Sequence, residues 1–297
     1  MRRWIASHPV TAFLMWAAVL SWPAWAGVFL AREAGVPWTH PIVFGLLVPA
    51  AAGPSLASCL VSFAAGGVAG VRRLAGRFES AGFHPAWYAG AAILPLALAY
   101  AASLAADLLG GVLPAGTESV QARMLPALAW CLAAAFGQEF GWRGFLLPAL
   151  GGRLRPALAG LAAGAVWGLW TLPAALIGFG NFGFFWTAVV LLLILGVVLP
   201  AHGVILAWFH HRTGGNLLIP IVFHFIFLAT AMLLVSPRLY GLETAFYWLI
   251  YALFAVWGAA AAARMLAETP PVAPHAGDAS TITDPSSVTP PDSPSER

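Results

Sequence analysis

Charged residues are scarce in this sequence: they make up 8% of its 297 residues, whereas hydrophobic residues make up 61%. A soluble globular domain has about 25% charged residues, because its surface faces water. A chain with so few charges cannot cover a water-facing surface, which excludes a soluble enzyme or binding domain. Lipid must be its outer solvent, so the composition predicts a protein that crosses the membrane several times.

Lysine is absent, so all 14 basic residues are arginines, against 11 acidic residues. No basic run is longer than two residues, which argues against a nucleic-acid-binding protein; the arginines fit the loops of a membrane protein instead. Cysteine is nearly absent too, and Cys59 and Cys131 both lie within apolar stretches. We interpret them as small buried hydrophobic residues and expect neither a disulfide nor a metal clip.

Long apolar stretches fill most of the remaining sequence, and a helix needs about 20 residues to cross about 30 Å of hydrocarbon. We expect an all-α bundle with about eight transmembrane helices, near residues 10–31, 41–64, 86–109, 125–150, 157–178, 184–209, 216–235 and 244–263. With the N-terminus inside, ten arginines fall in cytoplasmic segments and three outside, which predicts that both termini are cytoplasmic. The all-arginine, Ala-, Gly- and Pro-rich composition suggests a GC-rich genome, and we expect the cytoplasmic membrane of a bacterium.

Three parts are expected along the chain: N-terminal transmembrane helices over 1–124, a core of five further helices over 125–267, and a tail over 268–297. The tail is rich in Pro, Ser, Thr and Asp without apolar periodicity, so it is expected to be disordered and cytoplasmic. Within the core, glycines recur every four residues in a spacing that suits close contact between helices. These are Gly160, Gly164 and Gly168.

The first 26 residues allow two interpretations. Arg2-Arg3, an apolar run and the triplet Ala24-Trp25-Ala26 together resemble a secretory signal with its cleavage site. The apolar stretch continues beyond Ala26, however, and contains the bulky Trp16 and Trp22. We therefore favour a retained membrane anchor over a cleaved signal.

Ionisable residues at membrane depth are few, and each costs roughly 2.5–3.5 kcal/mol on insertion scales, so they usually face a partner or a cavity. Glu139 and Arg143 lie four residues apart, in the order that favours an ion pair on one helix face. The pair either locks the bundle core or lets Arg143 orient Glu139 beside a water-filled cavity. Gln138 lies about 100° further round the helix and is expected to point elsewhere. His224 and His202 each stand alone on apolar helices, where histidines more often pack than bind a ligand.

The segment Gly137–Pro148, GQEFGWRGFLLP, resembles the first motif of the CPBP intramembrane proteases, the family of type 2 CAAX prenyl endopeptidases and bacteriocin-related membrane proteases. That motif has two adjacent glutamates, three further residues and an arginine. Trp167–Pro173, WGLWTLP, resembles the second motif, an aromatic residue followed four residues later by histidine. Trp208–Gly215, WFHHRTGG, resembles the turn before the third motif, so His224 falls at that motif's histidine. The resemblance covers roughly residues 125–235 and implies a CAAX-protease-like helical bundle.

The resemblance also implies a role for each motif position, and three of the six positions are substituted. Glu139, Arg143 and His224 are retained. Gln138 stands where the family has the glutamate taken to activate the attacking water, and an amide lacks the basicity for that step. Thr171 replaces the second-motif histidine. Leu228 replaces an asparagine able to stabilise an oxyanion, a loss that costs about 10²–10³-fold in rate.

A divalent metal such as zinc is suggested by the family, but the ligand set supports it poorly. Metal-assisted hydrolysis requires about three protein ligands and an open position. Glu139 and His224 supply two, and His202 would have to be recruited as the third.

These substitutions predict a CPBP-family membrane protein with a degraded proteolytic site. Such a pseudoprotease would bind a membrane peptide or protein client without the usual cleavage, and its partners would be the lipid bilayer and this client, not nucleic acid. The alternative is an active intramembrane endopeptidase that hydrolyses CAAX-type peptides with a rearranged site of Glu139 and His224. A transporter or channel is a weaker third interpretation, because the sequence has too few intramembrane charges to line a path.

Overall fold

The computed structural model describes residues 2–38, 40–78, 83–108, 120–180, 183–232 and 241–268, and these residues form helices and connecting turns without any strand. The all-α prediction is confirmed, whereas the predicted disordered tail lies outside the described residues apart from Glu268. The elements are α1 (Arg2–Ser7), α2 (Pro9–Glu33), α3 (Pro41–Ala75), η1 (Gly76–Phe78), α4 (Ala86–Leu108), α5 (Val120–Gly141), η2 (Trp142–Leu146), α6 (Leu147–Gly151), α7 (Pro156–Phe179), α8 (Phe184–Leu191), η4 (Leu192–Val198), α9 (Leu199–Arg212), α10 (Leu218–Thr230) and α11 (Gly241–Ala267).

Each predicted transmembrane segment overlaps a helix or a continuous helical run among the described residues. Within the described residues, six runs are long and apolar enough to cross a membrane: Pro9–Glu33, Pro41–Phe78, Ala86–Leu108, Pro156–Phe179, Phe184–Arg212 and Leu242–Ala267. The predicted spans 125–150 and 216–235 are not among the six. Helix α10 has only 13 residues, and α5 carries polar residues of the site described below. The chain is a polytopic helical membrane protein, and the number of eight crossings stays a prediction.

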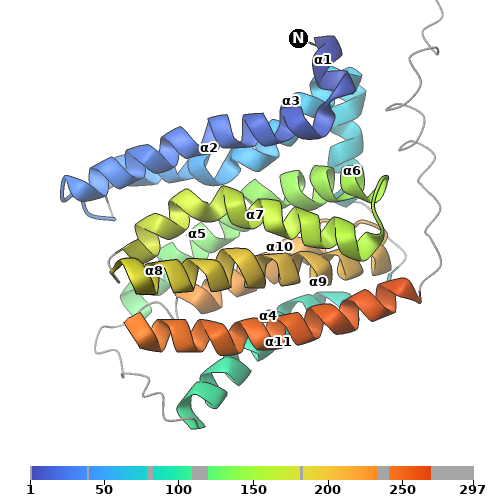
Figure 1. Ribbon diagram of the computed structural model, residues 1–297. Coiled ribbons are helices and arrows are strands. Elements are labelled where there is room, and N and C mark those ends of the chain that lie inside the picture. The colour runs from blue at the N-terminus through green and yellow to red at the C-terminus, as the bar shows by residue number, and fades with distance from the viewer. Residues whose placement is uncertain are drawn as a thin grey trace, which may run out of the picture.

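Prolines mark where several helices begin, because the fixed φ of proline suits the first helical turn and its missing N–H is not needed there. Pro9, Pro41 and Pro156 begin α2, α3 and α7. Helix α3 is interrupted at Gly67, whose φ of 59° and ψ of −150° are open to glycine but strained for other residues. Gly67 therefore redirects the arginine-bearing end of α3 (Figure 1).

The helices lie in layers that run roughly in one direction (Figure 1). Helices α2 and α3 pair along one side, and α3 packs on α5. The central part contains α5, α7, α9 and α10, while α4 and α11 pack against each other on the opposite side. Large apolar side chains project outward, among them Phe184 at 94% exposure and Trp257 at 75%. Such a surface suits contact with lipid.

Helices α7 and α9 are in backbone contact along the predicted glycine stripe. A Cβ added at Gly160 would lie 2.7 Å from the carbonyl oxygen of Gly203, and one at Gly164 would lie 2.7 Å from the Cα of Pro200. A Cβ at Gly168 would collide with the carbonyl oxygen of Leu195. The three glycines therefore allow α7 to approach η4 and α9 closely, as their spacing predicted.

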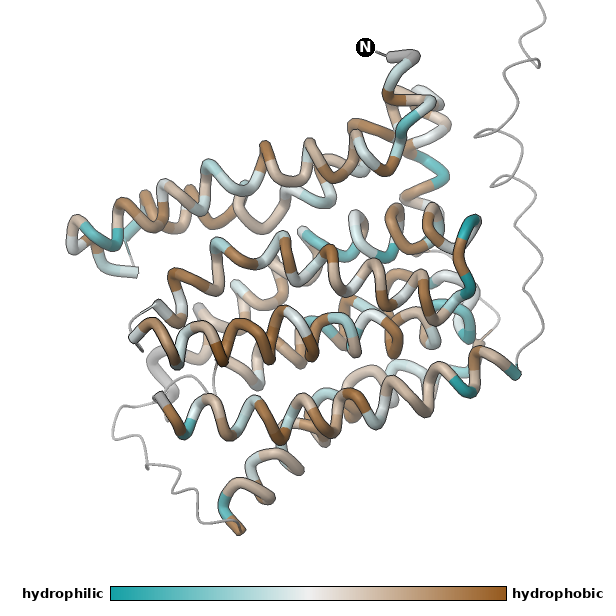
Figure 2. The backbone as a smooth tube through the Cα atoms, in the orientation of Figure 1, coloured by the Kyte–Doolittle hydropathy of each residue, from teal (hydrophilic) through white to brown (hydrophobic). Residues whose placement is uncertain are grey.

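Polar residues gather at the two ends of the bundle (Figure 2). The ends of α3, α6, α9 and α11 all lie at the same end as the N-terminus (Figure 1). These elements and the adjoining turns carry Arg72, Arg73, Arg77, Arg153, Arg155, Arg212 and Arg264. We call this the arginine end; the last turn of α2, with Arg32, lies at the other end. Asp107 is exposed at the far end of α4.

Helix α2, which contains most of the possible signal sequence, packs into the bundle. Phe13 is fully buried, with its ring centroid 5.5 Å from that of Trp142. The indole N–H of Trp170 donates to the carbonyl oxygen of Ala17 over 3.3 Å, and that of Trp22 donates to the carbonyl oxygen of Trp170 over 3.2 Å. Through these contacts α2 packs as an integral helix of the bundle. Retention of residues 1–26 as a membrane anchor stays a prediction.

Candidate functional site

Three polar side chains from two distant parts of the sequence meet in the interior of the bundle. Glu139 comes from the end of α5, Arg143 from η2 and His224 from α10. The Nη1 of Arg143 donates to Oε1 of Glu139 over 2.8 Å, and Nδ1 of His224 lies 2.7 Å from the same oxygen. All three are at most 1% exposed. The predicted ion pair is therefore confirmed, and His224 joins it.

The backbone that carries Glu139 is held by glycines facing α3. A Cβ at Gly137 would lie 3.0 Å from the carbonyl oxygen of Ala51, and one at Gly141 would lie 2.5 Å from that of Pro54. Directly after Gly141 the helix changes to the π form in η2, Trp142–Leu146. π-Turns of this kind are rare and occur frequently at functional sites. Here the π-turn carries Arg143, so it helps to set where the guanidinium lies.

Gln138 is also buried, at 8% exposure, and its side chain points to α7. The indole N–H of Trp167 donates to Oε1 of Gln138 over 3.0 Å. Because an indole nitrogen can only donate, the amide carbonyl of Gln138 must face Trp167, which fixes the amide orientation. Gln138 thus faces a different helix from Glu139, as its position round α5 predicts.

Trp167 nevertheless connects Gln138 with the charged group. Its ring centroid lies 4.4 Å from Cζ of Arg143, a cation–π distance, and 4.7 Å from the ring of His224 in an edge-on arrangement. By its place in the sequence, Trp167 is only the aromatic residue that begins the second motif. Its place at the start of that motif was the available signal, but its contacts depend on how α7 packs against α5 and α10.

The other two substituted positions lie one helical turn beyond residues of the site. Thr171 follows Trp167 on α7, and its hydroxyl donates to the carbonyl oxygen of Trp167 over 2.8 Å. This bond within the same helix satisfies the hydroxyl donor, and the hydroxyl makes no hydrogen bond to Glu139 or His224. Leu228 follows His224 on α10 and is half-buried among apolar side chains. Neither position presents a polar group to the charged residues.

His202 is fully buried on α9 in an aromatic surrounding. The rings of Phe227, Phe223 and Tyr251 lie 4.7, 5.0 and 5.8 Å from its ring centroid. Its Nε2 lies 3.3 Å from the hydroxyl of Tyr251, while its Nδ1 has no hydrogen-bond partner. The contacts support the interpretation of His202 as a packing residue.

The side chains that meet here do not fit a three-ligand metal site. In the part of the chain that the structure describes, no group of three His, Cys, Asp or Glu residues could hold a metal ion. Glu139 and His224 already contact each other directly, and His202 is enclosed by aromatic rings. Cys59 and Cys131 are both free thiols; Cys131 is buried as predicted, whereas the prediction is wrong for Cys59, which is only half-buried.

The charged side chains of the cluster lie close together, but not all of their polar atoms form hydrogen bonds. Oε1 of Glu139 is shared by Arg143 and His224, whereas Oε2 of Glu139 and Nη2 of Arg143 are buried without a partner. Buried polar atoms of this kind usually find a protein group or a water. One carboxylate oxygen and one guanidinium nitrogen thus remain available to a further polar group. The predicted water-filled cavity beside them stays a prediction.

Comparison with protein families agrees with the motif analysis. Residues 120–230 match a family model described as "Type II CAAX prenyl endopeptidase Rce1-like". The matched range runs from the start of α5 to the end of α10 and so includes every residue of the cluster. Comparison with curated proteins gives no match. The segment 120–230 is thus similar to the Rce1-like CAAX endopeptidases, and in this chain it carries the buried Glu139–Arg143–His224 cluster of a helical membrane protein.

Proposed function

We propose that this protein binds a membrane peptide or protein client and does not cleave it by the usual mechanism of its family. The observation that carries the proposal is that a glutamine, Gln138, occupies the position of the catalytic base and is held by a hydrogen bond. This residue stands where the family resemblance implies the water-activating glutamate, and its carbonyl oxygen accepts a hydrogen bond from Trp167. An amide in that position cannot take a proton from water near neutral pH.

Glu139 is a poor substitute for the missing base as long as its present contacts persist. Its Oε1 accepts from Arg143 and contacts His224, and charge-assisted hydrogen bonds are among the strong ones in proteins. Taking up a proton would weaken both interactions at once. The arrangement therefore favours a stable charged cluster over a group that exchanges protons during turnover.

An active endopeptidase with a rearranged site is the second candidate, and one contact favours it. Nδ1 of His224 lies 2.7 Å from Glu139, and Oε2 of the same carboxylate has no partner. A water held by Oε2 would stand next to a carboxylate–imidazole pair, which is the composition of many general-base sites. This candidate predicts that removal of His224 abolishes turnover.

The test uses the purified full-length chain in detergent with a panel of transmembrane and CAAX-type peptides. Binding is measured by fluorescence anisotropy and cleavage by mass spectrometry of the products. We expect binding without cleavage for the native chain. Cleavage that persists in Glu139→Ala would point to a contaminating protease, whereas cleavage lost in both Glu139→Ala and His224→Ala variants that remain folded would establish the second candidate.

The reverse experiment restores the substituted positions by Gln138→Glu, Thr171→His and Leu228→Asn together. A glutamate at 138 has the shape of the glutamine and can accept the same indole N–H, so the first change should be tolerated. We expect the triple variant to gain cleavage of peptides that the native chain only binds. The matched control is the same triple variant with Glu139→Ala, which should lose the gained activity.

We also propose that the arginine end faces the cytoplasm of a bacterial cell. The asymmetry of arginines between the two ends supports this orientation, because positively charged loops are retained on the cytoplasmic side. Both termini would then be cytoplasmic.

A further inference from the structure

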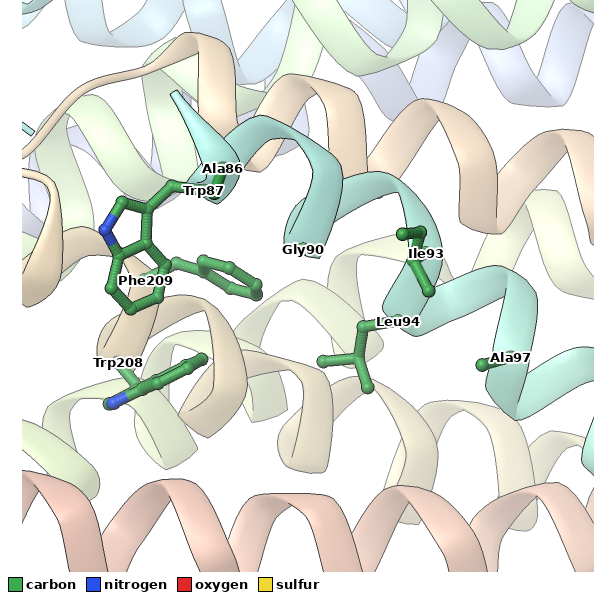
Figure 3. A pocket seen from close by; sticks show the side chains of 8 residues that line it. All are labelled: Ala86, Trp87, Gly90, Ile93, Leu94, Ala97, Trp208 and Phe209. Atoms are coloured by element: carbon green, nitrogen blue, oxygen red, sulfur yellow. The ribbon is translucent and has the colours of Figure 1, made fainter. Parts of the chain in front are cut away.

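A groove with a volume of about 490 Å³ lies between α4 and α9, and no residue of the Glu139 cluster lines it. Its walls are made by Ala86, Trp87, Gly90, Ile93, Leu94, Ala97, Trp208 and Phe209 (Figure 3). We propose that this groove is a binding site for an anionic phospholipid, with an acyl chain along its aliphatic part and the phosphate at the arginine end.

The wall of the groove changes character along its length. Trp87 and Trp208 stand near its Ala86 end, and their indole nitrogens point away from the aliphatic part formed by Ile93, Leu94 and Ala97 (Figure 3). Their rings pack edge-on, with centroids 5.1 Å apart. Tryptophan is enriched where the hydrocarbon of a bilayer meets its headgroups, because the ring is apolar and its N–H is polar. The groove is thus aliphatic at one end and lined by tryptophan rings at the other, where Trp87 suits the interface and the indole N–H of Trp208 is buried without a hydrogen-bond partner.

One arginine and two histidines follow the tryptophan end of the groove along the chain, beyond the residues that line it. Arg212 is exposed and His211 half-buried, four and three residues after Trp208, so both lie one turn further along the same side of α9. His84 is exposed just before α4, where its Nδ1 accepts from the backbone N–H of Ala86 over 3.1 Å. An anionic headgroup would meet these groups where an acyl chain leaves the groove.

The surrounding charge favours an anion over a zwitterion. Of the acidic residues that the structure describes, Glu33, Asp107 and Glu243 lie at the opposite end, Glu139 lies in the interior, and only Glu268 lies at the arginine end. A choline or ethanolamine group would be repelled by the arginines, whereas a phosphate without such a group is attracted. A purely apolar occupant would leave Arg212 and the two histidines without any role.

The test compares phosphatidylglycerol with phosphatidylcholine of identical acyl chains, added to the delipidated full-length chain in detergent. Binding is measured by native mass spectrometry over a series of lipid concentrations. We expect phosphatidylglycerol to bind at least about tenfold more tightly. Arg212→Gln should weaken phosphatidylglycerol about fivefold and leave phosphatidylcholine unchanged, the change expected for one cation at the membrane surface.

A second variant tests the groove itself. A Cβ at Gly90 would meet Phe209 at an ordinary 3.7 Å, so Gly90→Leu fits the helix while its side chain fills the groove. It should abolish the tight site for phosphatidylglycerol. The controls are Arg155→Gln, an exposed arginine of the same end that does not line the groove, and Gly178→Leu, a helical glycine with open space around it. Equal affinity for the two lipids, or unchanged binding in Gly90→Leu, would overturn the proposal.

Discussion

At the scale of single residues, the buried ion pair of Glu139 and Arg143 carries a large cost in lost hydration. Two charges removed from solvent lose several kcal/mol of hydration each, and only their mutual attraction and good hydrogen bonds offset that loss. Glu139 gains both from Arg143 and a further contact from His224, while the face of Trp167 covers the guanidinium. Each charge in the cluster therefore depends on its partner.

This dependence predicts the effect of Arg143→Met, which keeps most of the side-chain length but removes the charge. Glu139 would remain buried without its cation, so we expect the variant to lose about 3–5 kcal/mol of stability. Thermal and denaturant unfolding of the purified protein in detergent measures the loss. Adding Glu139→Gln to the variant should restore part of it, because the uncompensated carboxylate is then gone.

The matched control is Arg155→Met, which removes an exposed arginine at the start of α7. Its stability should lie within about 0.5 kcal/mol of the native protein. If Arg143→Met were no more destabilising than this control, the ion pair would not be the element that holds the cluster together.

The sequence predicted part of this cluster. The spacing of Glu139 and Arg143 predicts their pairing, because residues four apart share a helix face. The motif resemblance singled out His224. The bond between Trp167 and Gln138 was not predicted, because it joins side chains 29 residues apart and depends on the packing of α5 against α7.

At the scale of the helical elements, backbone contact between α7 and α9 sets the geometry of the central layer. In lipid, helices gain little from hydrophobic association, so close van der Waals packing over small residues becomes a main source of attraction. The contact brings Trp167, next to Gly168, into the interior where it covers Arg143. The glycine stripe therefore helps to position the site.

Gly164→Val should separate these helices, since even a Cβ at this position would lie 2.7 Å from Pro200 Cα and would clash with the carbonyl oxygen of Leu199. Overpacking of this kind costs about 1–3 kcal/mol, and more where backbone atoms must move. We expect a lower melting temperature and reduced yield of monodisperse protein by size-exclusion chromatography.

Gly178→Val provides the control, because this glycine lies on the same helix with nothing within 4 Å of an added Cβ. It introduces the same β-branched residue without a clash. A melting temperature equally lowered in both variants would show that the effect comes from helix propensity and not from the contact with α9.

The helices themselves were predictable to within a few residues at most ends, because long apolar runs have few alternatives in a bilayer. The π-turns η2 and η4 were not predicted. Such turns insert a residue into a helix that is otherwise regular, and the local sequence does not mark them. Gly137 and Gly141 have the same four-residue spacing as the α7 stripe, so their contact with α3 could have been predicted as well.

At the scale of the whole molecule, the two ends of the bundle differ in charge, because most of the described arginines lie at one end. The arginine end carries the turns and helix ends of α3, α6, α9 and α11, whereas α2 ends at the opposite side (Figure 1). Arginine charges next to short loops bias insertion so that these loops stay in the cytoplasm.

Reporter fusions test the orientation. A fluorescent protein fused after Ala267 should fluoresce, and alkaline phosphatase fused there should be inactive, because that end of α11 is expected in the cytoplasm. Phosphatase inserted in the turn after Glu33 should be active. The opposite pattern at both sites would reverse the proposed orientation, while the fold described here would remain the same.

The π-turn after Gly141 has a consequence for how this chain can change in length. An α-helix advances 100° per residue, and a π-turn takes up about one residue more than an α-turn. Deleting one residue from Trp142–Leu146 would therefore restore regular winding instead of breaking the helix. The segments on either side would keep their contacts, and a deletion after Arg143 would leave the four-residue spacing between Glu139 and Arg143 unchanged. A single-residue deletion after Arg143 should therefore preserve both the helical scaffold and the ion pair, so this turn is a place where the chain tolerates a change in length.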